Sequence, residues 1–270
     1  MVEGVFMGDI YNLILLFFAI LPVILLLSYV YKKDNNKEPF KLLIILFLLG
    51  IVSCFLVLLI SFLLKLFLPF MDTTGRSSFI DVMLYAFLGV GLVEELCKWL
   101  MVYLFGYRSK YFDEIYDIIV YSIFVSLGFA FFENILYVLL NQKLTLAFTR
   151  GVFSIPGHAC FALFMGYYLC IAKVCHIKGK NNSKTKNLIL SIIVPSLLHG
   201  IFDFCLMSGY KLFMLSFIIF IVILFIISIK KINEMSDYSN ILKSKNRFCK
   251  NCGALLNGQF CSGCGTYQNK

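Results

Sequence analysis

Every account of this chain has to accommodate one stretch, Gly89-Val90-Gly91-Leu92-Val93-Glu94-Glu95-Leu96-Cys97-Lys98-Trp99. It lies inside an apolar run from Phe79 to Phe105, which is long enough to cross a bilayer. Charged side chains at that depth are costly, so a membrane-spanning segment normally excludes them. Two glutamates and a lysine at this position therefore predict a functional site inside a transmembrane helix.

The composition is that of an integral membrane protein. Of the 270 residues, 60% are hydrophobic and 14% are charged, whereas a soluble domain is about half apolar and about a quarter charged. Apolar runs of about 20 residues recur along the chain, which predicts transmembrane helices. The first run follows Glu3 and Asp9 without a basic region, so we expect it to stay as an anchor and not to be cleaved as a signal peptide.

Seven apolar segments are predicted to cross the membrane. They are Ile10–Tyr31, Leu42–Leu68, Phe79–Phe105, Ile115–Leu140, Ala147–Ala172, Leu188–Ser208 and Leu212–Ile229. The loops after the first, third and fifth segments and the C-terminal tail carry most of the 24 lysines and arginines. Basic loops stay in the cytoplasm, so we predict a cytoplasmic C-terminus and an external N-terminus. Topology also explains the net charge of +9, and we expect no direct contact with nucleic acid.

Helical spacing places the three charges of the opening stretch on one face. Lys98 follows Glu94 by four positions and Glu95 by three, and side chains at these spacings are neighbours on a helix. The lysine can neutralise one carboxylate, but two adjacent carboxylates in a low dielectric cannot both ionise cheaply. A carboxylate in such a setting is a good candidate for a general base.

Three other segments carry polar side chains at helical spacing. These are Glu133 with Tyr137, His158, and His199 with Asp203. Prolines and a glycine interrupt the helices near both histidines, and broken backbone within a bilayer is tolerated where it lines a cavity or water. At about 1.5 Å per residue, Glu133, His158 and His199 lie about 10–13 Å from the outer surface, but Glu94 lies at about 20 Å. We therefore expect the third segment to begin above the membrane surface.

These residues resemble the four motifs of the PrsW family of intramembrane proteases. The motifs are Glu94-Glu95-x-x-Lys98, Phe132-Glu133-x-x-x-Tyr137, His158-x-x-Phe161 and His199-x-x-x-Asp203. They occur in the family's order on successive apolar segments, and the resemblance covers roughly residues 11–229. The family is similar in turn to the superfamily of CAAX prenyl proteases and bacteriocin-immunity proteins.

The resemblance implies a multi-pass protease of a bacterial cell membrane that carries out regulated intramembrane proteolysis. The substrate it implies is a single-span membrane protein. The best-known role in the family is the first cleavage of a membrane-bound anti-sigma factor, which releases a stress response. These are expectations from the family, because nothing in the sequence identifies a substrate.

Resemblance and side-chain chemistry together suggest peptide-bond hydrolysis by an activated water. Either Glu94 or Glu95 would be the general base, and His158 would help to hold the water. His199, oriented by Asp203, would donate to the developing oxyanion. Glu133 would be a second carboxylate, acting as an acid or as a metal ligand. Lys98 and Tyr137 would support these groups.

The same inventory of glutamates and histidines could also hold Zn²⁺. However, the sequence has no His-Glu-x-x-His pair on one helix, which is the common zinc-protease arrangement. We therefore favour a metal-free, glutamate-dependent site and keep the metal-dependent site as the alternative.

The tail contains a second cluster of ligand-type residues. Cys249, Cys252, Cys261 and Cys264 form a C-x2-C-x8-C-x2-C pattern, which suits tetrahedral Zn²⁺ and predicts a small zinc ribbon. A reducing cytoplasm favours zinc over disulfides, and so short a module needs the metal to fold. The ribbon would bind a cytoplasmic partner or regulate the protease. The other six cysteines are predicted to be ordinary buried residues.

The predicted fold class is thus an all-α polytopic membrane protein of about seven transmembrane helices with a small C-terminal zinc ribbon. The predicted domains are a transmembrane protease domain (1–232), a polar linker (233–247) and the ribbon module (248–270). Two other functions remain open. Buried Glu, Lys, His and Asp side chains also suit a proton-coupled transporter, although no inverted repeat is evident. A catalytically inert membrane sensor is the third option.

Overall fold

The computed structural model describes residues 2–34, 36–71, 78–109, 111–112, 114–245, 247–249, 251–252, 255–256, 261, 263–264 and 266–267. The helical elements are α1 (Val2–Lys33), α2 (Phe40–Lys65), η1 (Pro69–Met71), α3 (Phe79–Leu84), η2 (Tyr85–Leu92), α4 (Val93–Met101), η3 (Val102–Tyr107), α5 (Asp117–Asn141), α6 (Leu144–Thr149), η4 (Arg150–Ser154), α7 (Ile155–Ile177), α8 (Asn181–Met207) and α9 (Lys211–Lys245). Two short strands follow, β1 (Arg247–Phe248) and β2 (Leu255–Leu256). The all-α polytopic fold is confirmed.

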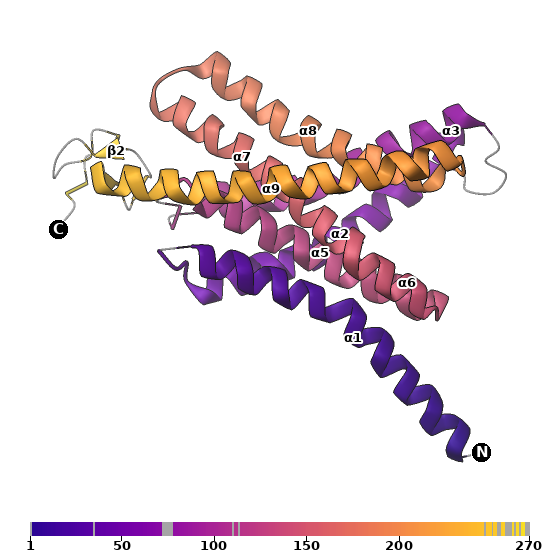
Figure 1. Cartoon of the computed structure of the whole chain (residues 1–270). Helices are drawn as coiled ribbons and strands as arrows, with labels where there is room; N and C mark the ends of the chain where they lie inside the picture. The colour runs from indigo at the N-terminus through magenta and orange to yellow at the C-terminus, as the bar shows by residue number, and fades with distance from the viewer. Residues whose placement is uncertain are drawn as a thin grey trace.

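Six helical segments of the described chain are long and apolar enough to cross a membrane. They are Ile10–Lys33, Phe40–Lys65, Asp117–Asn141, Leu144–Ile177, Asn181–Met207 and Lys211–Ser236. Each contains most of one predicted segment. The remaining predicted segment is the continuous helical path α3–η2–α4–η3, which carries the buried charges near its middle. In Figure 1 the helices of the bundle run roughly from left to right, with the start of α1 at the lower right and the end of α9 at the left.

The path through Phe79–Tyr107 alternates between α-helix and π-helix. The π-helical parts are η2, just before Glu94, and η3, which ends at Tyr107. A π-helical turn closes i→i+5 hydrogen bonds and occurs mostly at functional sites. It holds more residues than an α-helical turn, so the chain advances less per residue through η2 than an α-helix would.

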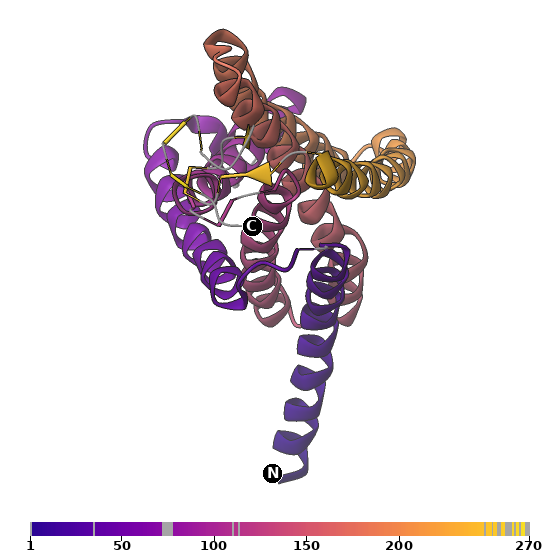
Figure 2. The same cartoon turned by 90° about the vertical axis from the view of Figure 1, so that its left-hand side faces the viewer.

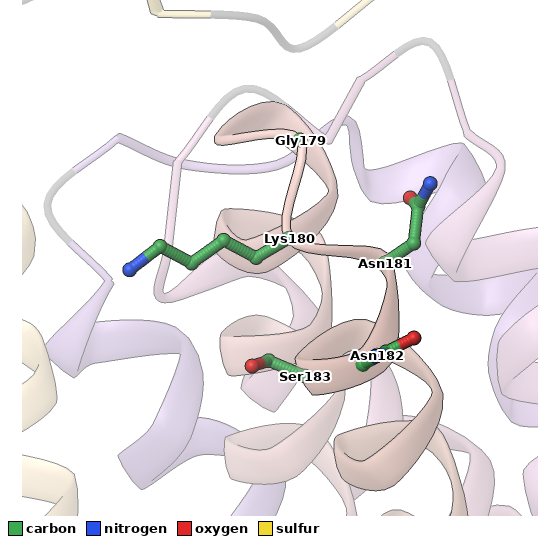
Figure 3. Close-up of a pocket in the computed structure, with 5 residues that line it drawn as sticks. All are labelled: Gly179, Lys180, Asn181, Asn182 and Ser183. Atoms are coloured by element: carbon green, nitrogen blue, oxygen red, sulfur yellow. The ribbon is translucent and has the colours of Figure 1, made fainter.

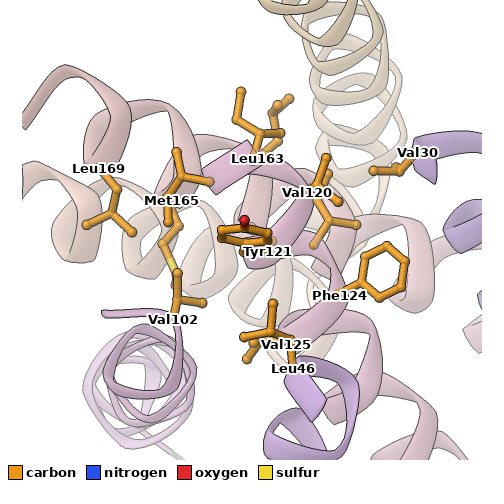
Figure 4. Packing of buried hydrophobic residues seen from close by; sticks show 14 of the residues in the cluster. Val30, Leu46, Val102, Val120, Tyr121, Phe124, Val125, Leu163, Met165 and Leu169 are labelled. Atoms are coloured by element: carbon orange, nitrogen blue, oxygen red, sulfur yellow. The ribbon is translucent and has the colours of Figure 1, made fainter. Parts of the chain in front are cut away.

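Helix α5 is the central helix of the bundle. Every residue from Asp117 to Ala130 is buried, because α1, α2 and α7 pack around it (Figures 1 and 4). A helix that is apolar on all sides belongs in the interior of a bundle. Tyr121, Val125 and their neighbours form the main cluster together with Leu46 of α2 and Met165 of α7.

Two glycines allow α2 and α5 to touch through their backbones. A Cβ atom on Gly128 would lie 2.0 Å from the carbonyl oxygen of Phe47, and one on Gly50 would lie 2.0 Å from that of Val125. Small residues at the interface bring membrane helices close, since packing rather than water exclusion drives their association. This contact anchors the half of α5 that precedes Glu133.

The tail differs in part from its prediction. Residues 233–245, within the predicted linker, are helical and continue α9 to Lys245. β1 and β2 then pair in antiparallel register, with Arg247 opposite Leu256. The N-terminal part of α1 extends away from the other helices (Figures 1 and 2). Residues 72–77, which precede the third predicted segment, lie outside the described residues.

Candidate active site

Lys98 lies at the centre of the polar cluster. Its Nζ is 3.1 Å from Oε2 of Glu94, 2.8 Å from Oε1 of Glu95 and 3.1 Å from Nδ1 of His158. The side chain is completely buried, and the ammonium sits 4.0 Å above the ring centroid of Phe129. The contact of the lysine with both glutamates is confirmed, and a histidine from another helix shares the ammonium.

His199 joins the cluster from α8. Its Nδ1 is 3.0 Å from Oε1 of Glu95, and its Nε2 is 3.5 Å from Oδ2 of Asp203 and 3.9 Å from Oε2 of Glu94. The imidazole stacks on Phe161 with 4.8 Å between the ring centroids, and it is perpendicular to the His158 ring at 5.1 Å. Both imidazoles therefore border the glutamate pair.

Glu133 reaches the cluster from α5. Its Oε2 lies 3.2 Å from Nε2 of His158 and 2.9 Å from Nη2 of Arg150. The arginine belongs to η4, near the start of the predicted segment Ala147–Ala172, and no role at the site was predicted for it from the sequence. Tyr137 does not approach Glu133 through a described hydrogen bond; its ring lies under the guanidinium of Arg150 at 4.0 Å. It supports the cluster through the arginine.

A close contact between η2 and α8 sets the distance between the third and sixth predicted segments. A Cβ on Gly91 would lie 2.8 Å from the carbonyl oxygen of Ser196 and 3.0 Å from the backbone nitrogen of Gly200. Only a residue without a side chain fits there. The contact is three residues before Glu94 in one element and beside His199 in the other, so it brings these two side chains together.

The depth mismatch inferred for Glu94 does not arise. Glu94 and His199 lie within 3.9 Å of each other, so they share one level of the bundle. The π-helical η2 contributes to this, because it advances less per residue between Phe79 and Glu94 than the α-helical count assumed. All eight predicted catalytic and supporting side chains thus gather around one centre.

The donor set fits a divalent metal ion. Glu94, Glu95, His158 and His199 are buried, and each offers one ligand atom within 4.8 Å of the others. Within the described residues, Oε2 of Glu95 is buried without a hydrogen-bond partner. Two imidazoles and two carboxylates are ligands that Zn²⁺ accepts. Asp203 and Glu133 lie next to the histidines, and a carboxylate that accepts a hydrogen bond from a metal-binding imidazole orients that ligand.

The four tail cysteines form a second possible metal site. Their sulfur atoms lie within 4.8 Å of one another, and the amides of Asn251 and Gly263 donate to Sγ of Cys249 and Cys261 at 3.4 and 3.3 Å. Hydrogen bonds from Thr266 lower the pKa of the Cys264 thiol to about 6, which favours the thiolate form that binds metal. The predicted grouping of these cysteines is confirmed.

A separate surface pocket of about 360 Å³ lies where α7 connects to α8 (Figure 3). It is lined by Gly179, Lys180, Asn181, Asn182 and Ser183. None of the predicted site residues lines it. The candidate site is the buried cluster within the bundle.

The fold and the cluster define a multi-pass helical membrane protein with a buried site of carboxylates and histidines. The model of the family described as PrsW family intramembrane metalloprotease matches residues 38–229, and this chain belongs to that family. The matched range contains all four motifs and excludes the tail cysteines. The resemblance inferred from the motifs is confirmed, and family membership indicates a hydrolase that acts as a protease.

Relatives from several bacteria support this assignment. The chain is similar to Protease PrsW of Oceanobacillus iheyensis, with 36% identity over 80% of this chain and 94% of the relative. It is 38% identical to Protease PrsW of Bacillus subtilis over 81% and 95% of the two chains, and 35% identical to that of Clostridioides difficile over 82% and 91%. No solved structure matches the chain.

Proposed function

We propose that this protein is an intramembrane endopeptidase that hydrolyses a peptide bond of a membrane-anchored protein, with Glu94 as the base that activates water. One observation carries the proposal: a buried glutamate pair and two imidazoles from separate helices bring one ligand-type atom each to within 4.8 Å of one another. A soluble protease has direct access to water, whereas a bundle of apolar helices needs polar groups to hold a water molecule at its buried site. The substrate class we propose is a single-span protein such as an anti-sigma factor, cut in regulated proteolysis.

The two glutamates have different surroundings. Glu95 is 0% exposed, and its Oε1 contacts both Lys98 and His199. Glu94 is 8% exposed and has longer contacts, at 3.1 Å to Lys98 and 3.9 Å to His199. We therefore assign proton transfer to Glu94 and positioning of Lys98 and His199 to Glu95.

The reaction balances with these residues. Glu94 takes a proton from water, and the oxygen of that water forms a bond with the carbonyl carbon of the substrate. In its protonated form, His199 donates Nδ1–H to Glu95 and keeps Nε2–H to donate to the developing oxyanion. The carbon–nitrogen bond then breaks, and Glu94 returns its proton to the leaving amine. His158 accepts from Lys98 at Nδ1 and so helps to hold the ammonium beside Glu94.

A metal would use the same donor set. Zn²⁺ held by Glu94, Glu95, His158 and His199 would polarise water and the substrate carbonyl as a Lewis acid. We keep the metal-free site as the proposal, because the Lys98 ammonium already places a positive charge against both glutamates, at 3.1 and 2.8 Å. The chain's membership of a family of intramembrane metalloproteases supports the alternative. Chelation of tail-deleted protein separates the two: activity that persists in metal-free protein excludes an essential active-site metal.

Reconstitution with candidate single-span substrates tests the proposed activity. Wild-type protein is expected to yield a truncated product, and Glu94→Gln and His158→Gln are expected to yield it much more slowly. Glu234→Gln and His176→Gln are matched controls, because both residues lie away from the cluster on exposed surface. Proton-coupled flux without cleavage would favour the transporter. Partner capture without cleavage would favour the inert sensor.

For the tail we propose a zinc ribbon held by Cys249, Cys252, Cys261 and Cys264. The grouping of the sulfurs and the amide donors to Cys249 and Cys261 support it. The ribbon would lie in the cytoplasm and bind a partner or regulate cleavage. Deleting residues 246–270 should remove one bound zinc and spare cleavage in the reconstituted assay; complete loss of cleavage in folded protein would assign the ribbon to the reaction.

A further inference from the structure

Arg150 belongs to η4, and three side chains of α5 contact its guanidinium group. Its Nη2 lies 2.9 Å from Oε2 of Glu133, its Nε donates to Oδ1 of Asn134 at 2.8 Å, and its guanidinium carbon is 4.0 Å from the ring centroid of Tyr137. Its side chain is only 16% exposed. A guanidinium with planar, directed donors suits such a fixed contact better than an ammonium does.

Helix α1 contacts both partners of this interaction, α5 through Asn134 and η4 through Gly151. Nδ2 of Asn134 donates to the carbonyl oxygen of Ala19 at 3.3 Å. Gly151, the next residue after the arginine, brings η4 so close to α1 that an added Cβ would lie 3.0 Å from the carbonyl oxygen of Phe18. Contacts among α1, α5 and η4 therefore set the position of Arg150 relative to α5.

Glu133 connects Arg150 to His158. The same oxygen, Oε2, contacts Nη2 of Arg150 and lies 3.2 Å from Nε2 of His158. An ionised carboxylate only accepts hydrogen bonds, so the ring nitrogen facing it has to be the donor. The other nitrogen, Nδ1, lies 3.1 Å from the Lys98 ammonium, which only donates. Both neighbours thus require the same form of the ring, with Nε2 protonated and Nδ1 free to accept.

We propose that Arg150 is a positioning residue that, by holding Glu133, fixes the tautomer and orientation of His158. The inference rests on the proposed function, because the ring that it fixes accepts from Lys98 at Nδ1 and so helps to hold the ammonium against the glutamate pair. Arg150 acts through Glu133 and does not touch the reacting atoms. Glu133 is accordingly an orienting carboxylate and neither the acid nor a metal ligand.

Ring-nitrogen NMR on the full-length protein in lipid nanodiscs tests the proposal. The chain has three histidines, so His158→Gln assigns its signal. Wild-type protein should show protonated Nε2 and unprotonated Nδ1 at His158. In Arg150→Gln, a second tautomer should appear and kcat should fall by about 10–100-fold, the usual effect of losing such an orienting contact, with KM little changed. Arg150→Lys, which keeps the charge but loses the planar fork, should fall between the two.

Two comparisons keep the test decisive. Arg108→Gln is the matched control, since Arg108 also lies over a tyrosine ring, that of Tyr103 at 5.0 Å, but away from the cluster. It should change neither the His158 signal nor cleavage. If Arg150→Gln does not fold, Arg150→Lys carries the test, and a wild-type His158 signal and rate in that variant overturn the proposal. If Arg150→Gln changes the His158 tautomer but the wild-type protein cleaves no substrate, the role of Arg150 is supported and the proposed protease activity is refuted.

Discussion

Oε1 of Glu95 lies 3.0 Å from Nδ1 of His199, although the two residues are 104 positions apart. The same oxygen lies 2.8 Å from Nζ of Lys98. One carboxylate atom therefore links α4 to α8 and also neutralises the buried lysine. This relationship separates the roles of the adjacent glutamates, because Glu94 makes only a longer contact with His199, at 3.9 Å.

The first prediction concerns the difference between Glu94 and Glu95. Glu94→Gln should keep wild-type stability but slow cleavage by about 10²–10⁴-fold, the usual contribution of a general base. Glu95→Gln should lose both stability and activity, because it weakens the link to Lys98 and His199. Thermal unfolding in detergent, followed by the fluorescence of Trp99, the only tryptophan, measures the first property. Equal stability losses in the two variants would contradict the assignment.

A second prediction concerns Lys98 as the counter-ion of the cluster. Lys98→Met leaves two buried carboxylates without their cation, and breaking a buried pair costs about 3–5 kcal/mol. The variant should therefore unfold at a much lower denaturant concentration than the wild type. Lys231→Met is the control, since Lys231 pairs with the exposed Glu234, and such surface pairs contribute about 0–1 kcal/mol. A Lys98→Met protein of wild-type stability would show that the glutamates are neutralised in another way.

Local spacing within one helix predicted much of the site. The contacts of Lys98 with Glu94 and Glu95, and that of His199 with Asp203, follow from i+3 and i+4 positions on a regular helix. The seven apolar segments were also evident, because a bilayer requires long apolar helices with paired backbones. The convergence of four segments came from the family resemblance, since no local rule specifies which faces of separate helices meet.

Other features left no local signal. Arg150 contacts Glu133 from 17 positions away across a helix hairpin, so no i+3 or i+4 spacing links the two residues. Its only signal in the sequence is a charged residue close to the inferred outer end of an apolar segment, and that position alone does not indicate a site. The π-helical η2 has no distinctive composition, and its effect on depth emerged only from the fold. The helical continuation of α9 past Asn233 was missed because the sequence there is polar and aperiodic.

A third prediction tests the close approach of η2 and α8. Gly91→Ala places a methyl group against the backbones of Ser196 and Gly200, which cannot move aside without shifting a helix. Overpacking of this kind costs about 1–3 kcal/mol, and cleavage should fall because His199 moves away from Glu95. Gly89→Ala is the matched control, since its new methyl group would mainly meet the flexible end of Met71. If both variants behave alike, the backbone contact does not position the site.

The fourth prediction is a metal count. Full-length protein purified without chelators should contain one zinc ion per chain if only the four tail cysteines bind metal, and Cys249→Ser with Cys261→Ser should contain none. Atomic absorption on both proteins makes the measurement. A zinc ion that remains in the double variant and is lost on adding His199→Gln would place metal in the buried cluster. That outcome would favour the metal-dependent mechanism over the metal-free one.

The last prediction concerns orientation. Lys143 lies between α5 and α6, and Lys180 lies between α7 and α8; both are exposed, and the single span Leu144–Ile177 separates them. The basic residues around Lys180 predict that its end of the bundle faces the cytoplasm. In intact cells, a membrane-impermeant thiol reagent should therefore label Lys143→Cys, whereas Lys180→Cys should be labelled only after permeabilisation. The unsubstituted chain reports the background of its native cysteines. The opposite pattern would invert the orientation and place the cysteine cluster outside the cell, where an oxidising environment would favour disulfides over bound zinc.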